Sequence, residues 1–165
     1  MNKVFAFTKN ADIILDRLIS TAKIVCDGKE KNVVAQWDTG ASGSCISHEV
    51  AREMKLIPAG IRKIQTPSGT CNVNTYLVDV FLPNHVTISD VMVCDSEIGS
   101  QGIGMLVGMD IINLGDFAVS NYSGKTVFSF RLPSVEKTDY VATIKKQNLR
   151  ALVGPPHGKG KKKKK

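Results

Sequence analysis

Short apolar runs rich in Val, Ile and Thr alternate with polar, glycine-bearing stretches along most of this chain. Short strands separated by frequent turns are typical of an all-β barrel or sandwich. No internal repeat is evident, and the length suits one domain. The strands expected from this pattern cover residues 4–7, 18–26, 33–37, 61–66, 71–82, 86–94, 105–107, 117–120 and 126–130.

Turn and capping residues separate these runs. Asp27-Gly28 and Ser123-Gly124 predict hairpin turns, and Pro67-Ser68-Gly69 predicts a turn between the fourth and fifth expected strands. Ser47 predicts the N-cap of a short helix over residues 48–55, because apolar residues four apart fall on one face there. A second helical turn is expected over residues 109–114.

The character of the chain changes after Leu132. Residues 133–165 are polar, contain Pro155-Pro156 and end in a run of lysines, so we expect a disordered tail. Residues 18–132 form the expected domain, and residues 1–17 form an N-terminal extension.

The positive charge is concentrated in that tail. The formal net charge is +7, from 22 Lys and Arg against 15 Asp and Glu. Lys159 and residues 161–165 supply six of the positive charges, which leaves 16 against 15 in the remainder of the chain. A solvated lysine run is expected, and the alternative is a weak, non-specific contact with nucleic acid or another polyanion.

The cysteines and histidines show no spacing typical of a metal site. Cys26, Cys45, Cys71 and Cys94 include no Cys-x-x-Cys pair, so we expect neither a metal nor a cofactor. No signal peptide and no apolar stretch of membrane-spanning length is visible. We therefore expect a cytoplasmic protein with reduced cysteines and no membrane contact.

The most informative stretch follows the third expected strand. There an apolar run, residues 33–37, leads directly into Asp38-Thr39-Gly40. Because that strand is expected to be buried, it carries Asp38 towards an interior or a cleft, where a carboxylate needs a hydrogen bond or a partner. Thr39 can donate from its hydroxyl, and Gly40 allows other backbone to approach closely. Taken alone, the triplet also fits a strand that ends in an ordinary turn.

Residues 38–42, Asp-Thr-Gly-Ala-Ser, resemble the signature of the retroviral-type, or retropepsin-like, aspartic proteases. Two other segments are similar to the same family. Leu106-Val107-Gly108-Met109-Asp110-Ile111-Ile112 matches its segment from a strand into a short helix, and Thr66-Pro67-Ser68-Gly69 matches the tip of its flap. The ending Leu114-Gly115-Asp116-Phe117 and Phe128-Ser129-Phe130 is similar to bacterial members. The resemblance spans the whole expected domain.

The resemblance implies a single-lobe acid-protease β-barrel with a flap hairpin and one or two short helices, assembled as a C2 homodimer. Aspartic proteases use two carboxylates that share one proton. No aspartate other than Asp38 precedes Thr-Gly or Ser-Gly in this chain, so the second carboxylate must come from Asp38 of another copy. The implied function is an aspartic endopeptidase that hydrolyses peptide bonds with a water activated between the two Asp38 carboxylates.

The resemblance also assigns roles to single residues. Asp38 is catalytic, and Thr39 and Gly40 support the active site, with Thr39 bracing the paired loops across the two-fold axis. Asp110 falls at a structural position at the head of a helix, where it is expected to cap. The residues expected to contact a polypeptide substrate are Gly40, Ala41, Ser42, Pro67, Ser68 and Gly69.

A second function stays open at this point. The chain could be a catalytically silent dimer that keeps the retropepsin fold as a peptide-binding or scaffold module. The intact Asp38-Thr39-Gly40 favours the enzyme, because a scaffold has little reason to keep like charges together. The chain departs from the family at Trp37, which is bulkier than usual, and at Ser44 and Cys45, where aliphatic residues are more usual.

Overall fold

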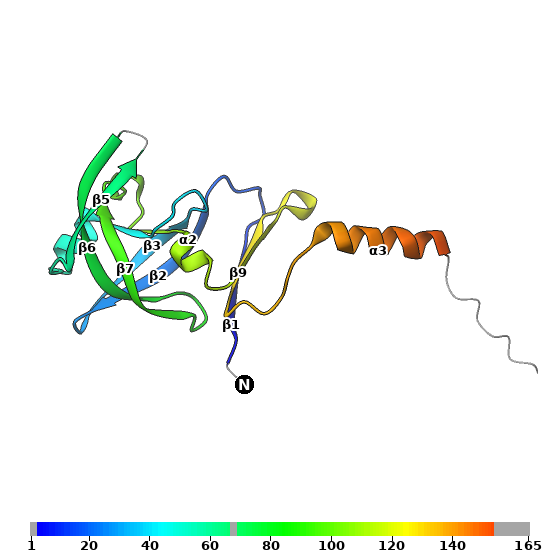
Figure 1. Ribbon diagram of the computed structural model, residues 1–165, viewed down its shortest axis with the longest axis horizontal. Coiled ribbons are helices and arrows are strands. Elements are labelled where there is room, and N and C mark those ends of the chain that lie inside the picture. The colour runs from blue at the N-terminus through cyan, green and yellow to red at the C-terminus, as the bar shows by residue number, and fades with distance from the viewer. Residues whose placement is uncertain (1–2, 67–68, 154–165) are drawn as a thin grey trace, which may run out of the picture. The chain divides into compact units, whose positions relative to one another are not determined.

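Ten short strands and three α-helices make up the part of the chain that the computed structural model describes, residues 3–66 and 69–153 (Figure 1). The chain divides into two units, Met1–Val135 and Glu136–Lys165. The strands are β1 (Phe5–Asn10), β2 (Leu18–Cys26), β3 (Lys29–Trp37), β4 (Cys45–Ser47), β5 (Gly60–Thr66), β6 (Gly69–Phe81), β7 (Thr87–Ser96), β8 (Met105–Val107), β9 (Asp116–Ser120) and β10 (Val127–Leu132). The helices are α1 (His48–Glu53), α2 (Met109–Ile112) and α3 (Tyr140–Val153), with 3-10 turns at Gly99–Gln101 and Tyr122–Gly124.

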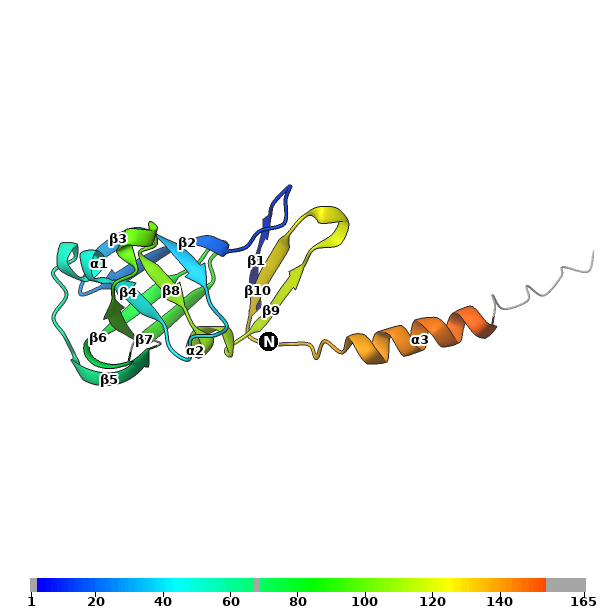
Figure 2. The ribbon, with the colours of Figure 1, turned by 90° about the horizontal axis from the view of Figure 1, so that it is seen from above.

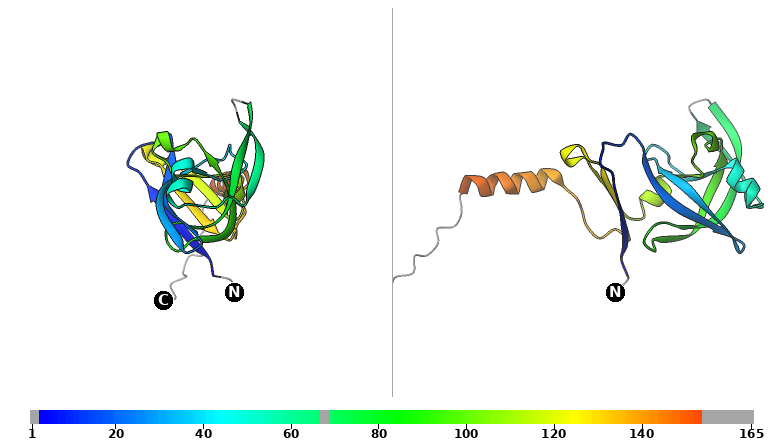
Figure 3. Two further views of the ribbon diagram at one scale, coloured as in Figure 1. Left: turned by 90° about the vertical axis from the view of Figure 1, so that its left-hand side faces the viewer. Right: turned by 180° about the vertical axis from the view of Figure 1, so that it is seen from behind.

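Six of the strands form a closed barrel. Their order is β2-β3-β8-β4-β7-β6, and the end of β6 returns to pair with β2. The left panel of Figure 3 shows this ring of strands from one end. The first half of β6 extends beyond the ring and pairs with β5, which makes a long hairpin at the edge of the barrel. Alternate residues of β2 and β7 point inward, and the barrel interior holds fully buried side chains such as Ile24, Val93 and Met105. The all-β barrel with a hairpin and short helices expected from the sequence is confirmed.

Local signals placed several elements correctly. Asp27 and Gly28 have φ values of +49° and +73° and form the tight turn between β2 and β3, which is the conformation that such a hairpin needs. The hydroxyl of Ser47 accepts a hydrogen bond from the Val50 N–H at 3.2 Å and caps α1 as predicted. This cap fixes where the chain leaves β4 and turns into the helix.

A second, three-stranded sheet lies beside the barrel, as Figure 2 shows, in the order β1-β10-β9. Aromatic side chains fill the space between this sheet and β3. The Trp37 and Phe117 rings stack with centroids 5.3 Å apart and an interplanar angle of 5°, and Phe130 lies 5.0 Å from Trp37. The Trp37 Nε1–H donates to the Ser20 hydroxyl at 3.0 Å, so its one polar atom is also satisfied. The bulk of Trp37 therefore has a structural reason.

The first residues of the chain are part of this sheet. β1 pairs with β10 along its whole length, from Phe5 opposite Leu132 to Asn10 opposite Val127. Phe7 is buried against Trp37, Phe128 and Phe130. Residues 1–17 were expected to be an extension outside the domain, but residues 5–10 contribute a paired strand and a core side chain to the first unit.

Two elements were missed. β4 has only three residues, all of them buried, so it has no alternation that a pattern could reveal. The second is α3, which lies in the tail that we expected to be disordered. The expectation was wrong because it rested on the composition of the whole tail, whereas Val141, Ile144 and Leu149 recur at near-helical spacing within it. At the start of α3, Asp139 accepts from the Ala142 N–H at 3.0 Å.

The lysine run at the end of the tail lies outside the described residues. In residues 3–66 and 69–153, no helix has the length and apolar character needed to cross a membrane.

Candidate active site

The loop that carries Asp38 begins where β3 ends. Trp37 pairs with Val107 in the parallel β3–β8 ladder, and the next residue, Asp38, donates its N–H to the Val107 carbonyl at 2.9 Å. The last ladder contact thus holds the backbone of Asp38 against β8. The side chain of Asp38 is half-buried, whereas Thr39 and Gly40 are exposed.

The Asp38 carboxylate is held by its own loop. Its Oδ1 accepts a hydrogen bond from the Gly40 N–H at 2.8 Å, and the Asp38 carbonyl accepts from the Ala41 N–H at 3.3 Å. A Cβ atom added to Gly40 would lie 3.1 Å from this same Oδ1. Glycine at position 40 therefore lets the loop fold closely around the carboxylate.

Behind the loop, α2 provides a second set of anchors. The Met109 N–H donates to the Ala41 carbonyl at 2.8 Å. The Ser44 hydroxyl donates to Asp110 Oδ1 at 2.6 Å and accepts from the Gly108 N–H at 3.0 Å, and the Ser44 N–H donates to Asp110 Oδ2 at 2.9 Å. Asp110 lies at the head of α2, as expected, but its carboxylate binds the loop as well as the Ile111 N–H. The strand-to-helix segment thus acts as a rigid support for the Asp38 loop.

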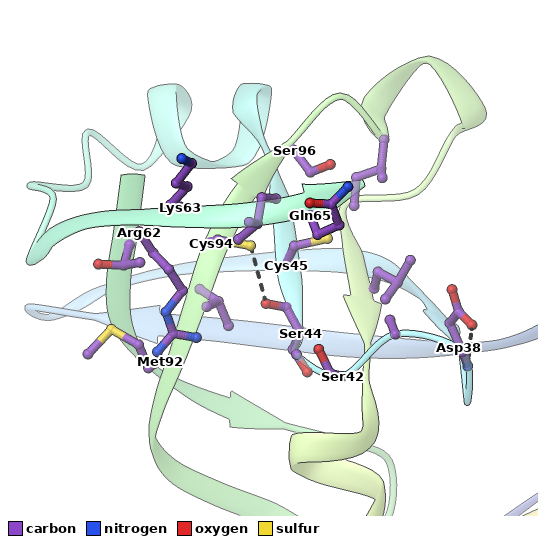
Figure 4. A pocket seen from close by; sticks show the side chains of 18 residues that line it. Asp38, Ser42, Ser44, Cys45, Arg62, Lys63, Gln65, Met92, Cys94 and Ser96 are labelled. Carbon is purple, nitrogen blue, oxygen red and sulfur yellow. Dashed lines mark hydrogen bonds between the residues drawn. The ribbon is translucent and has the colours of Figure 1, made fainter. Parts of the chain in front are cut away.

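A pocket of about 620 Å³ opens between this loop and the β5–β6 hairpin (Figure 4). Asp38, Gly40, Ala41 and Ser42 line one side of it. The opposite wall carries side chains of β5 and β7: Arg62, Lys63, Ile64, Gln65, Met92, Val93 and Cys94. The apolar side chains of Ile98 and Leu106 also line the pocket. Among the described residues that line the pocket, Asp38 is the only carboxylate.

The predicted site residues are distributed as follows. Asp38, Gly40, Ala41 and Ser42 come together at the pocket, while Thr39 is exposed beside them. Gly69 begins β6 with a φ of +122° at the tip of the hairpin, a conformation that favours glycine. Pro67 and Ser68 lie outside the described residues. The sequence did not identify the opposite wall, although the hairpin expected over residues 61–82 could have suggested that β5 faces the site.

Two thiols lie in the pocket wall. Cys45 of β4 is the register partner of Cys94 of β7, and Figure 4 shows both side chains among those that line the pocket. A hydrogen bond from the Cys45 thiol, set against desolvation, lowers the pKa of Cys94 to about 7. The same hydrogen bond, together with burial, raises the pKa of Cys45 far above its ordinary value. The Cys94 sulfur also lies 3.9 Å from the Ser44 carbonyl.

A buried carboxylate, Asp95, lies directly after Cys94. It accepts from the Asn74 N–H at 2.9 Å, from Asn74 Nδ2 at 2.8 Å and from the Tyr76 hydroxyl at 3.2 Å, and His48 Nδ1 lies 3.4 Å away. Burial alone would raise the pKa of Asp95, but the hydrogen bonds from Asn74, the nearby His48 and Tyr76 outweigh it and lower that pKa. Asp95 thus joins β6, β7 and the start of α1 behind the pocket.

The closed barrel with a hairpin beside its pocket is the retropepsin-like fold, the fold of a class of aspartic proteases. The crystal structure of a retropepsin-like aspartic protease from Rickettsia conorii matches with a TM-score of 0.53 and 12% sequence identity, over 80% of this chain and 98% of that one. The solution structure of Simian Foamy Virus (mac) protease matches with a TM-score of 0.41 and 20% identity, over 58% of this chain and 92% of that one. No protein-family model matches the sequence, and a search of curated proteins found no match. At 12% identity, the likeness to the Rickettsia conorii structure shows the fold alone.

Proposed function

We propose that this chain is an aspartic endopeptidase of the bacterial retropepsin-like type and works as a C2 homodimer. The observation that carries the proposal is the position of Asp38. It is a single carboxylate on a glycine-bearing loop, held by the Gly40 N–H and facing a pocket of about 620 Å³ in a retropepsin-like barrel. The similarity of residues 114–117 and 128–130 to bacterial members supports the bacterial type.

The chemistry requires two such carboxylates. Two Asp38 side chains placed close together share one proton, since both cannot be ionised at close range. The ionised carboxylate takes a proton from a water molecule, whose oxygen adds to the carbonyl carbon of the peptide bond, while the protonated carboxyl donates to the carbonyl oxygen. Transfer of a proton to the amide nitrogen then lets the C–N bond break. Loop residues that fix Asp38 to β8 and α2 keep the carboxylate in position for these steps.

Dimerisation follows from the need for two catalytic carboxylates. Since Asp38 is the only carboxylate among the described lining residues, a second copy has to supply its partner. Thr39 is exposed next to Asp38, where its hydroxyl can bond to the loop of the other copy. In this arrangement a two-fold axis runs between the two Asp38 loops.

The pocket suits a polypeptide. Its apolar side chains, among them Ile64, Met92 and Leu106, can receive apolar residues of a bound peptide, and Gly40, Ala41 and Ser42 offer backbone groups along the loop. The hairpin tip at residues 66–69 is proposed as the flap that covers the bound chain. The four cysteines are free thiols, which supports the cytoplasm as the place of action.

The test compares the wild type, Asp38→Asn and Asp27→Asn on a library of peptides from a digested proteome, at several pH values. Asparagine keeps the size of the side chain and can still accept from the Gly40 N–H, but it cannot act as a base. We expect Asp38→Asn to lose all measurable cleavage, and Asp27→Asn, the same change at the β2–β3 turn, to keep it. Cleavage by Asp38→Asn within roughly tenfold of the wild type would show that another residue performs the chemistry.

Mixing the subunits tests the dimer. An excess of Asp38→Asn chains should suppress wild-type activity through mixed dimers, and sedimentation should show a dimer at the concentrations of the assay. An active monomer would refute the proposal. A dimer that binds peptides and cleaves none would favour the alternative, a silent peptide-binding or scaffold module.

A further inference from the structure

Cys45 and Cys94 lie opposite each other on neighbouring strands, an arrangement in which a disulfide can form. They are direct partners in the parallel pairing of β4 with β7, so both side chains point to the same face. Neighbouring strands lie about 4.7–4.9 Å apart, and disulfides form across Cα separations of about 4.4–6.8 Å. Each thiol is the first cause of the shifted pKa of the other, so the two lie close enough to affect each other's protonation. Little backbone movement is needed to join them.

The pocket gives small molecules access to this pair. Both cysteines line it, and Cys94 is half-buried while Cys45 is 8% exposed. The two thiols differ in acidity. The interaction with Cys45 and, to a smaller extent, the Arg62 charge lower the pKa of Cys94 to about 7, which favours its thiolate. Cys45 stays protonated, since burial and the bond to Cys94 raise its pKa. One sulfur is thus ready to attack, and the other is held beside it as a neutral thiol.

The other two cysteines lack this arrangement. Cys26 pairs with Lys29 and Cys71 with Ile64, so neither has a cysteine as its strand partner. Burial and the neighbouring Asp27 raise the pKa of Cys26. Cys71 is exposed on β6. These two residues provide internal controls in the same chain.

We propose that Cys45 and Cys94 form a redox-sensitive thiol pair in the pocket wall, which a hydroperoxide converts to a disulfide and a dithiol reductant restores. The Cys94 thiolate attacks the outer oxygen of the peroxide, the O–O bond breaks, and Cys94 becomes a sulfenic acid while an alkoxide or hydroxide leaves. The Cys45 sulfur then attacks the Cys94 sulfur, and the hydroxyl leaves as water with the Cys45 proton. In total, two thiols and one hydroperoxide give one disulfide, one alcohol or water, and one water.

The disulfide would also act on the pocket itself. β4 follows directly on the loop 38–44, and Ser44, the anchor of that loop to Asp110, precedes Cys45. A disulfide between Cys45 and Cys94 replaces two thiols of the pocket wall with a cross-link next to this anchor, and so changes the wall that faces Asp38. This consequence rests on the proposed function, whereas formation of the disulfide does not.

The experiment treats the full-length reduced protein with one equivalent of hydrogen peroxide at pH 7.5, blocks remaining thiols with a maleimide under denaturing conditions, and maps the cysteines by mass spectrometry. Trypsin places Cys45 in residues 32–52 and Cys94 in residues 64–125, and a chymotryptic cut after Phe81 separates Cys94 from Cys71. We expect a peptide pair linked through Cys45 and Cys94, lighter by two hydrogens, and unlinked, maleimide-labelled Cys26 and Cys71. A dithiol should remove the link.

Single substitutions test the order of the steps. In Cys45→Ser the sulfenic acid on Cys94 has no partner, so dimedone should label Cys94. In Cys94→Ser, dimedone should leave Cys45 unlabelled. Four results would each overturn the proposal. They are oxidation of Cys26 or Cys71 before oxidation of Cys45 and Cys94, disulfides only between chains, a sulfinic acid on Cys94 without any disulfide, and full maleimide labelling of both pocket cysteines. If a variant does not fold, the mapping of disulfides in the unsubstituted protein still tests the proposal.

A peptidase assay on the same samples separates this inference from the proposed function. Oxidation should lower cleavage and the dithiol should restore it. A linked pair in a protein that cleaves no peptide refutes the protease and leaves the thiol pair standing. An active enzyme without the link refutes the thiol pair and leaves the protease standing.

Discussion

Replacing Ser44 with alanine tests the support of the Asp38 loop most directly. Ser44 is 1% exposed, and its hydroxyl has two partners: it donates to Asp110 Oδ1 at 2.6 Å and accepts from the Gly108 N–H at 3.0 Å. Ser44→Ala removes both hydrogen bonds but keeps the bond from the Ser44 N–H to Asp110, which does not need the side chain. The change is therefore limited to one oxygen atom between the loop and α2.

The expected loss of stability follows from the two groups that lose a hydrogen bond, the Asp110 carboxylate and the Gly108 N–H. A hydrogen bond to a charged group contributes about 1.5–3 kcal/mol, and a buried donor without a partner costs about 1–3 kcal/mol. The Asp110 residue is exposed, so its carboxylate can recover part of its loss from water, whereas the Gly108 N–H is buried. We expect Ser44→Ala to lower the free energy of unfolding by about 2–3 kcal/mol, at the lower end of the combined range.

Urea unfolding at one fixed protein concentration measures this change, since dimer formation would make the midpoint depend on concentration. With a typical slope of about 2 kcal/mol per molar urea, the midpoint should fall by roughly 1 M. Ser42→Ala is the matched control, because Ser42 lies on the same loop and is exposed, and it should change stability by less than about 0.5 kcal/mol. Equal midpoints for Ser44→Ala and Ser42→Ala would refute the role given to the Ser44 hydroxyl.

Two further predictions concern the surroundings of the pocket. Gly108→Ala would bring a Cβ to 2.6 Å from the backbone of Gly43, whereas a Cβ on Gly43 meets nothing within 4 Å. In thermal unfolding, Gly108→Ala should lower the free energy of unfolding by about 1–3 kcal/mol, and Gly43→Ala should leave it almost unchanged. Equal melting temperatures of the two variants would contradict this close packing. Asp95→Asn should destabilise the protein at pH 7 and progressively less below pH 4. The lowered pKa of Asp95 gives stability that is present above the unfolded value of about 3.9 and is lost as the pH falls through the folded pKa. Urea midpoints of both proteins across pH 3 to 7 check this, and a difference that does not change with pH would argue against a charged Asp95 in the folded state.

The sequence predicted the elements whose signals are local. The Asp27-Gly28 turn and the Ser47 cap each depend on a few adjacent residues, and the strand into Asp38 is a continuous apolar run. Asp38, Gly40, Ala41 and Ser42 could be proposed together because they belong to one short segment, and all four line one pocket; their roles stay predictions.

The opposite wall of the pocket depends on pairings that no local pattern contains. Cys45 meets Cys94 only because a three-residue strand lies parallel to β7, and parallel pairing joins residues far apart in the chain. Similarly, the short apolar run at the start of the chain gave no indication that it would pair with β10, so residues 1–17 were set outside the domain. α3 was missed because the proline, glycine and lysine content of the tail as a whole outweighed the near-helical spacing of Val141, Ile144 and Leu149.

The pairing of β1 with β10 sets the order of events when the protein is made. During synthesis β1 leaves the ribosome well before its partner β10, which is complete only when Leu132 has emerged. Until then Phe7 and Trp37 lack the aromatic neighbours that β9 and β10 supply, among them Phe117 and Phe130. Contacts of such long sequence separation slow folding, because the intervening loop must close before the contact stabilises it. The nascent chain therefore holds an unpaired β1 and a partly uncovered Trp37 until β10 has emerged.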